Sequence, residues 1–380
     1  MTYHAPDHAV VHGLVRDEVL RIAPYNAGLS DDAVRARYSA PTIVRLASNE
    51  NPLGMSTAVA AAIRECGAAA YPDARCENLR AALAAATGIA PDRIVTGNGS
   101  EDIIKMLCEA FLESGDRVVT ASPAFGLHES YPTMMGATID AVPVTTALTY
   151  DVPALAAALR RGAKMLLLGN PSNPVGCVLD DAALRTLIDA APADTLIVID
   201  EAYYEFASGA GYADSIGLLA AQRRPWVVLR TFSKAYGLAG LRAGYGLVSN
   251  PSLVDLLNRV RTPFNVNTFA QVAAIAALRD TGHVERTVAL VAEQRNWMRE
   301  QLGQLGLEPA PSHANFLFID LKRNAADVAE QILAHGIIVK PWKEKGYESF
   351  LRISIGMPAD NAAFITALRT IMRPEATQRT

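Results

Sequence analysis

Residues 231–246, TFSKAYGLAGLRAGYG, place one lysine and one arginine among small and apolar residues. Lys234 lies between a serine and a glycine-rich run that Arg242 follows. A lysine among apolar groups loses hydration, which lowers its pKa and favours attack on a carbonyl carbon. Thr231, Ser233 and Arg242 add hydroxyls and a guanidinium, a set suited to a phosphate dianion. The alternative is that Lys234 is an ordinary, solvated loop lysine, and other parts of the chain are needed to distinguish the two.

Further polar residues follow strand-like runs. Asp200 ends the aliphatic run LIVID, Tyr203 comes three residues later, and Asn173 lies between prolines in residues 169–176, GNPSNPVG. A carboxylate at the end of a buried strand is costly without a cationic partner, and prolines hold an amide donor in place. Phe125, in TASPAFG, could stack on a flat ligand. The alternatives are that Asp200 caps a short helix and that Phe125 packs in the core.

A glycine turn precedes a helix at residues 96–102, TGNGSED. Gly97 and Gly99 allow a tight turn, and Ser100 with the first helical N–H groups, including that of Glu101, could bind an anion. The third glycine of the dinucleotide-binding fingerprint is missing. An ordinary turn with Ser100 as N-cap stays open.

Taken together, these groups predict a site for pyridoxal 5′-phosphate. That cofactor requires a lysine for its aldehyde, an acid at its pyridine nitrogen, donors for its phenolic oxygen, an aromatic neighbour and an anion site. A protonated ring nitrogen makes the ring an electron sink, which stabilises the carbanion formed when a substrate loses its α-proton. Lys234 and Asp200 are the two residues on which this prediction depends.

Alternating strand-like and helix-like segments must position these residues. Between residues 54 and 255, apolar runs separated by helical patterns predict a mostly parallel sheet covered on both faces, with strands at 93–97, 117–123, 164–171, 195–203 and 225–234. Ligands of such sheets bind beyond the carboxyl ends of the strands. After residue 256, a helical region over 271–306 and strand candidates at 314–321, 336–342 and 350–356 predict a smaller α+β domain. Residues 1–53 are expected to form an arm and part of that domain, with a cleft between the lobes.

Composition excludes several classes of protein. Half of the 380 residues are hydrophobic and 19% are charged, which indicates a globular protein. The net charge of −4 argues against nucleic acid or an anionic membrane as main partner, and the absence of a signal-like pattern predicts a cytoplasmic location. Four cysteines without a CxxC pair indicate reduced thiols. His4, His8 and His12 could share a helical face, but chain ends fray, so no metal site is expected.

In the order of its motifs, the chain resembles the class I/II aminotransferases of the aspartate aminotransferase fold, and among them the histidinol-phosphate aminotransferases. The resemblance extends from APYNAG to LRISIG and includes SNENPLG, AYPD, GNGSED, NPSNPVG, VIDEAYYEF and RTFSKAYGLAGLRAGYG. It implies the α/β fold type I of pyridoxal phosphate-dependent transferases, in which a large domain with a mostly parallel seven-stranded sheet between helices is joined to a smaller α+β domain.

The resemblance also implies individual roles. Lys234 would bind the cofactor aldehyde and move the substrate proton, Asp200 would pair with the ring nitrogen, and Phe125 would stack on the ring. Asn173 and Tyr203 would hold its phenolic oxygen. The phosphate would be bound by Ser100, Glu101, Thr231, Ser233 and Arg242, and by Tyr71 from a neighbouring subunit, so a homodimer with shared active sites is implied.

For the substrate, the resemblance implies contacts from Tyr25, Asn51, Arg352 and Lys340. Arg352 would clamp a carboxylate through its planar fork. Lys340 stands where histidinol-phosphate members commonly carry a second arginine, and it offers a point charge without the two-pronged geometry. An aromatic amino-acid aminotransferase and a threonine-phosphate decarboxylase therefore stay open as alternatives, with 2-oxoglutarate and glutamate as the expected partner pair for transamination. A ligand-sensing regulator is disfavoured, since the chain ahead of SNENP is short and not basic.

Overall fold

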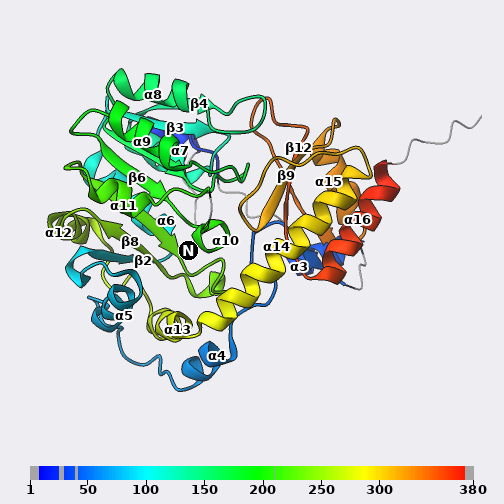
Figure 1. Ribbon diagram of the computed structural model, residues 1–380, viewed down its shortest axis with the longest axis horizontal. Helices are drawn as coiled ribbons and strands as arrows, with labels where there is room; N and C mark the ends of the chain where they lie inside the picture. Colours follow the sequence, from blue (N-terminus) through cyan, green and yellow to red (C-terminus); the bar gives the residue numbers. More distant parts are fainter. Residues whose placement is uncertain (1–7, 25–29, 39–41, 210, 373–380) are drawn as a thin grey trace, which may run out of the picture.

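The larger of two domains is built on a seven-stranded sheet (Figure 1). The computed structural model describes residues 8–24, 30–38, 42–209 and 211–372. The strands follow the order β2 (Ile94–Gly97), β8 (Gly244–Val248), β7 (Trp226–Thr231), β6 (Leu196–Asp200), β5 (Met165–Gly169), β3 (Arg117–Ser122) and β4 (Thr138–Pro143). All neighbours are parallel except those of β8, which runs antiparallel to both β2 and β7. The predicted mostly parallel sheet is confirmed.

Both faces of this sheet are buried, because alternate residues of its strands enter two different hydrophobic clusters. In β6, Ile197 and Ile199 belong to the cluster on one face, and Leu196 and Val198 belong to the other. The first face is covered by α4 (Thr57–Arg64), α5 (Glu77–Thr87), α8 (Val152–Arg160), α9 (Asp181–Ala190), α11 (Ser215–Ala220) and α13 (Thr268–Arg279). The second is covered by α6 (Ser100–Phe111), α7 (Leu127–Met134) and α12 (Pro251–Val260). Continuous apolar strands are what a doubly covered sheet requires.

The smaller domain contains a three-stranded antiparallel sheet in the order β11 (Lys340–Pro341), β12 (Phe350–Ser354) and β9 (Phe316–Asp320). Helices α14 (Thr281–Gly303), α15 (Ala325–Leu333) and α16 (Pro358–Met372) share its hydrophobic core. The early chain joins it, since β1 (Val44–Arg45) pairs in parallel with β10 (Ile337–Ile338). Arg37, in α3 (Asp31–Tyr38), forms an ion pair of 2.5 Å with Glu330 of α15.

Residue 255, the predicted domain boundary, lies inside α12. Helix α13 also belongs to the large domain, where its buried alanines Ala270, Ala273, Ala274 and Ala277 enter the core. Small side chains let this helix approach α4 and α5 closely. The chain passes to the small domain at Asp280, which ends α13 and caps the N-terminus of α14.

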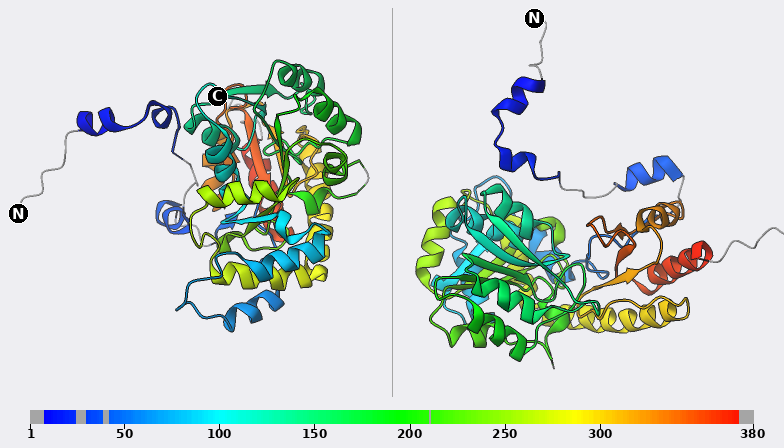
Figure 2. Two further views of the ribbon diagram at one scale, coloured as in Figure 1. Left: turned by 90° about the vertical axis from the view of Figure 1, so that its left-hand side faces the viewer. Right: turned by 90° about the horizontal axis from the view of Figure 1, so that it is seen from above.

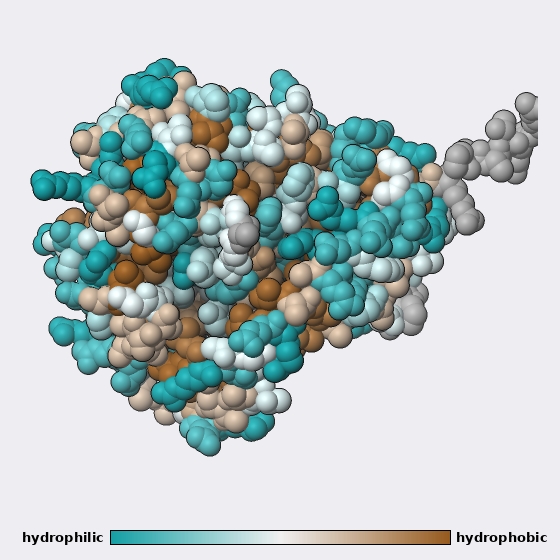
Figure 3. Space-filling model, viewed as in Figure 1, coloured by the Kyte–Doolittle hydropathy of each residue, from teal (hydrophilic) through white to brown (hydrophobic). Residues whose placement is uncertain are grey.

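The first helix, α1 (His8–Leu14), extends from the body of the molecule, and α2 (Asp17–Leu20) contacts α7 (Figure 2). The short helix α10 (Tyr204–Ala207) and the 3₁₀ turns η1 (Pro91–Arg93) and η2 (Ala239–Leu241) complete the elements. Hydrophilic side chains predominate over the small domain on the face seen in Figure 3. Within the described ranges, no helix combines the length and apolar character that crossing a membrane demands.

Candidate active site

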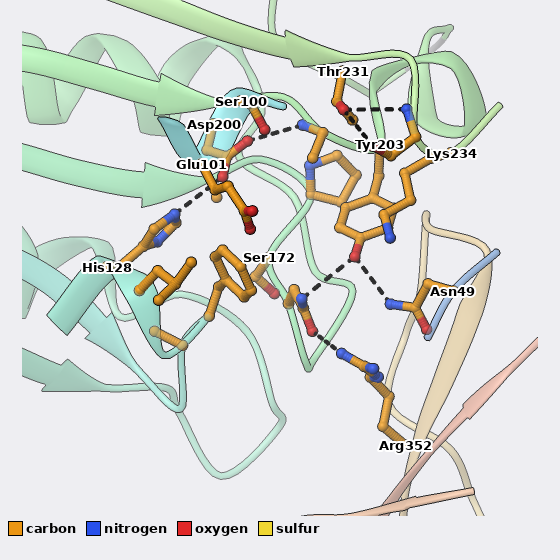
Figure 4. Close-up of a pocket in the computed structure, with 18 of the residues that line it drawn as sticks. Asn49, Ser100, Glu101, His128, Ser172, Asp200, Tyr203, Thr231, Lys234 and Arg352 are labelled. Carbon is orange, nitrogen blue, oxygen red and sulfur yellow. Dashed lines mark hydrogen bonds and ion pairs between the residues drawn. The ribbon is translucent and has the colours of Figure 1, made fainter. Parts of the chain in front are cut away.

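A cavity of about 550 Å³ opens beyond the carboxyl ends of β5, β6 and β7 and is closed on its far side by residues of the small domain (Figure 4). This volume is within the usual range for a small-molecule site. The predicted residues that line the cavity are Ser100, Glu101, Phe125, Asn173, Asp200, Tyr203, Thr231, Ser233, Lys234, Lys340, Arg242 and Arg352. The fold therefore brings side chains more than 250 positions apart in sequence into one space (352 − 100 = 252).

Lys234 follows the end of β7 and points into this cavity. Its amine donates a hydrogen bond of 3.0 Å to the carbonyl oxygen of Ser48. Burial lowers the pKa of Lys234 to about 8, and the positive charge of Arg352 acts in the same direction, while Glu50 opposes them. A lysine with a lowered pKa has a larger neutral fraction near neutrality, as a nucleophile for an aldehyde requires.

Asp200 ends β6 and is 6% exposed. Its Oδ2 lies 3.0 Å from Nε2 of His128, a residue that the sequence reasoning missed. His128 is buried in α7, with its ring edge-on to that of Phe125 at 5.6 Å. The alternative of a helix cap does not hold, since α10 begins only at Tyr204 and has no side-chain cap. His128 instead fixes the carboxylate at the cavity wall. Because His128 comes three residues after Phe125, the sequence alone could have suggested that it lies near the same site.

An anion-binding arrangement lies at the N-terminus of α6. Gly99 precedes this helix with φ +83°, and a Cβ there would lie 2.4 Å from Nη2 of Arg242. Arg242 itself has φ +63°, donates to Ser233 Oγ over 3.3 Å and pairs with Glu101 at 2.8 Å. The hydroxyl of Thr231 donates to that of Ser233 over 3.0 Å. A helix N-terminus, two hydroxyls and a guanidinium together suit a phosphate group.

The hydroxyl oxygen of Tyr203 accepts hydrogen bonds from Asn173 Nδ2 at 3.3 Å and from Asn49 Nδ2 at 2.9 Å. Arg352 Nη1 donates to Asn173 Oδ1 over 2.6 Å, and Nη2 donates to the carbonyl oxygen of Ala47. Lys340 on β11 lies directly opposite Arg352 on the neighbouring strand β12. Burial lowers the pKa of Lys340, and the charges of Arg352 and Lys343 lower it further. The positive charges of Arg352 and Lys340 at this end of the cavity suit an anionic group of the substrate.

Two predicted residues, Asn51 and Tyr71, do not line the cavity of their own chain. Asn51 does not line it, because its side-chain amide donates to Ala235 O (2.8 Å) and Thr287 Oγ1 (3.1 Å), which holds the backbone next to Lys234. Asn51 therefore makes structural contacts in this conformation, and the substrate contact expected from it stays a prediction. Tyr71 is 82% exposed and stacks on Phe264 with ring centroids 4.7 Å apart, outside the cavity. Tyr25 lies outside the described residues, as do His4 and the side chain of His8.

Comparison with known proteins agrees with this geometry. The sequence model for "Aminotransferase class I and II" matches residues 41–368. The chain belongs to the class I and II aminotransferases. This aminotransferase is 48% identical to histidinol-phosphate aminotransferase 3 of Rhizobium meliloti (strain 1021), with 94% of this chain and 97% of the relative aligned. It is 40% identical to histidinol-phosphate aminotransferase of Moorella thermoacetica, over 94% and 92% of the two chains.

Solved structures confirm the predicted fold. The crystal structure of histidinol-phosphate aminotransferase from Sinorhizobium meliloti in complex with pyridoxal-5′-phosphate superposes with a TM-score of 0.86 at 28% identity, covering 94% of this chain and 97% of that one. An L-threonine-O-3-phosphate decarboxylase from Porphyromonas gingivalis superposes with a TM-score of 0.77 at 25% identity, covering 87% and 99%. One fold thus serves different reactions, and the residues of the cavity must distinguish them.

Proposed function

We propose that the protein is a pyridoxal phosphate-dependent aminotransferase that transfers the amino group of histidinol phosphate to 2-oxoglutarate, giving imidazole acetol phosphate and glutamate. The observation that carries the proposal is that Lys234 and Asp200 line the same cavity, next to the anion-binding arrangement at the start of α6. The Rhizobium meliloti and Sinorhizobium meliloti relatives support the substrate and the cofactor.

The donor set of the cavity fits the cofactor. Asp200, held by His128, would pair with a protonated ring nitrogen, and Phe125, whose ring lies edge-on to that of His128, would supply the aromatic neighbour. Asn173 and Tyr203 offer polar groups for the phenolic oxygen, and the arrangement at the start of α6 suits the phosphate, with Ser100, Glu101, Thr231, Ser233 and Arg242 around it. When bound, pyridoxal phosphate supplies a ring that withdraws electrons from the substrate Cα.

The chain's own residues supply the proton chemistry and substrate binding. The neutral amine of Lys234 would accept the proton that leaves Cα of the amino donor and deliver it to the cofactor carbon that carried the aldehyde, and it would move a proton in the opposite direction in the second half-reaction. Arg352 binds the carboxylate of glutamate, and Arg352 with Lys340 provides positive charge for the phosphate of histidinol phosphate. Holding a carboxylate in an ion pair favours its retention, which disfavours the decarboxylase alternative.

We also propose that the active enzyme is a homodimer in which Tyr71 reaches the neighbouring subunit's phosphate site. Tyr71 and Phe264 form an outward-facing aromatic pair, 82% and 40% exposed. Exposed aromatic rings in contact favour a protein interface. The cytoplasmic location stays a prediction.

A donor panel tests the proposal. The purified protein should be yellow, and borohydride should fix the chromophore on Lys234, as peptide mass mapping would show. Histidinol phosphate, phenylalanine, tyrosine and threonine phosphate are then compared as donors to 2-oxoglutarate. Fastest turnover of histidinol phosphate supports the proposal. Preference for an aromatic amino acid, or release of carbon dioxide from threonine phosphate, would select one of the two alternatives.

A further inference from the structure

We infer that Asn49 is a positioning residue for Tyr203, with its side-chain amide directing the tyrosine hydroxyl toward the ligand. This inference rests on the proposed function, since it concerns the residue that faces the cofactor's phenolic oxygen. Asn49 lies in the cavity wall but belongs to the early chain, far in sequence from the strand ends that supply most of the site. Its place in the network of hydrogen bonds supports the assignment.

Asn49 is held on every side. It is 1% exposed, and its backbone has φ +56°, a left-handed conformation that asparagine tolerates better than most residues. Its carbonyl oxygen accepts from Asn315 Nδ2 at 2.9 Å, and its backbone N–H donates to Ser354 Oγ over 2.8 Å. A strained backbone persists only where surrounding contacts determine it, and such residues concentrate at functional sites.

The direction of the Asn49 amide is set by Ser354. The Ser354 hydroxyl donates to Asn49 Oδ1 over 2.9 Å, so Nδ2 faces the other way and donates to Tyr203 over 2.9 Å. Ser354 is itself buried, and its backbone N–H is bonded to Leu46. The donor that Tyr203 receives is therefore fixed by groups that do not touch the ligand.

The consequence concerns the hydrogen of the tyrosine hydroxyl. A hydroxyl has two acceptor positions and one hydrogen to donate. The hydroxyl oxygen of Tyr203 accepts from both Asn49 and Asn173. These two accepted hydrogen bonds favour approach of a ligand oxygen to the hydroxyl as a donor, which is the polarity needed beside a negatively charged phenolic oxygen.

Asn49 also links β12 to the segment that follows β6. Ser354 and Arg352 are two residues apart on β12, so their side chains lie on the same face of the strand. Tyr203 follows β6 of the large sheet, and its ring packs edge-on against Phe316 of β9 with centroids 5.1 Å apart. A movement of β12 that accompanies substrate binding at Arg352 would thus reach Tyr203 through Ser354 and Asn49.

The test uses the visible band of the cofactor-loaded protein and the pH midpoint at which that band changes. The phenolic oxygen of the cofactor attracts the proton on the Lys234 nitrogen less strongly when it already accepts a hydrogen bond from Tyr203. The hydrogen bond from Tyr203 therefore lowers the pH midpoint of the band. Asn49→Gly removes the amide and tolerates the left-handed backbone. We expect its midpoint to rise by about 0.5 pH units, and that of Asn49→Asp, which replaces the donor by an acceptor, to rise further.

A double-mutant cycle separates this role from a merely structural one. In the Tyr203→Phe background, Asn49→Gly should shift the midpoint no further, because the hydroxyl through which it acts is gone. Asn361→Ala is the matched control: Asn361 is equally buried, but its amide bonds Gly356 and Gln294 outside the cavity. That control should lower thermal stability and leave the midpoint unchanged.

The outcomes are distinguishable. A protein with no chromophore on Lys234 would overturn the proposed function. A chromophore whose midpoint responds to Tyr203→Phe but not to either Asn49 variant would overturn only the inference, as would an equal shift from Asn49→Gly with and without the Tyr203 hydroxyl. If Asn49→Gly fails to fold, Ser354→Ala replaces it, with a smaller rise expected.

Discussion

At the scale of single residues, the chemistry depends on a lysine that is partly neutral near neutral pH. Because burial lowers the pKa of Lys234 to about 8, about one amine in ten is neutral at pH 7. The rate at which cofactor-free protein captures pyridoxal phosphate should therefore rise about tenfold per pH unit below pH 8 and level off above it. Stopped-flow absorbance measures this rate. Lys234→Ala serves as the control, and a rate that kept rising to pH 10 would contradict the lowered pKa.

The carboxylate at the opposite wall gives a second prediction. Asp200→Asn removes the negative charge that keeps the ring nitrogen protonated, and it should lower kcat by about a hundredfold or more. His128→Gln disturbs only the group that orients this carboxylate, so a loss of about tenfold is expected. Steady-state kinetics with histidinol phosphate compares the two variants. Equal losses would mean that His128 does more than orient Asp200.

The same scale shows what sequence could and could not predict. The sequence could predict that Lys234 and Asp200 lie at the site, because a lysine or a carboxylate directly after a buried strand is costly unless it binds a ligand or a partner. His128 and Asn49 were not, since their roles depend on partners 72 and 154 positions away, respectively. Asn51 shares the motif SNENPLG with Asn49, but its side-chain amide bonds Ala235 and Thr287 and does not line the cavity. Only the backbone path decides which of the two amides faces the cavity.

At the scale of elements, the contact between β8 and the start of α6 positions the anion-binding arrangement. A Cβ on Gly244 would lie 2.2 Å from the backbone nitrogen of Ser100, so Gly244→Ala must displace that helix terminus. We expect a loss of about 1–3 kcal/mol in unfolding free energy together with weaker binding of pyridoxal phosphate.

The matched control for this substitution is Gly240→Ala. No heavy atom lies within 4 Å of a Cβ built on Gly240, so its stability and cofactor affinity should stay near those of the unmodified protein. Urea denaturation and fluorescence titration measure the two quantities. Similar behaviour of both alanine variants would show that the approach of β8 to α6 is unimportant.

Strand prediction succeeded where a strand forms a continuous apolar run and failed where it does not. The five predicted runs contain β2, β3, β5, β6 and β7, but β4 and β8 were not among them. Strand β4 lies at the sheet edge with partly exposed residues, so it lacks an apolar run. Strand β8 contains two glycines, which weaken the strand pattern. The packing of the α13 alanines in the core of the large sheet was not predicted, because their packing partner is evident only in three dimensions.

At the scale of the whole molecule, the proposed sharing of sites between subunits can be tested by complementation. Lys234→Ala and Tyr71→Ala variants should each be nearly inactive alone. When the two are mixed, unfolded and refolded together, hybrid dimers would contain one site with both Lys234 and the neighbour's Tyr71, so activity should return in part. No recovery, with hybrid dimers demonstrated by native mass spectrometry, would contradict a shared site.

The hydrogen bond from Lys234 to Ser48 has a consequence for how the protein is made. This contact spans 186 positions, and the cavity wall is not complete until β12 is in place. On a ribosome, the strands of the large sheet could pair while the segment bearing Arg352 is still unsynthesised. Contacts so distant along the chain form late in folding. Pyridoxal phosphate should therefore stabilise only the complete chain, and nascent chains truncated before β12 should not retain it.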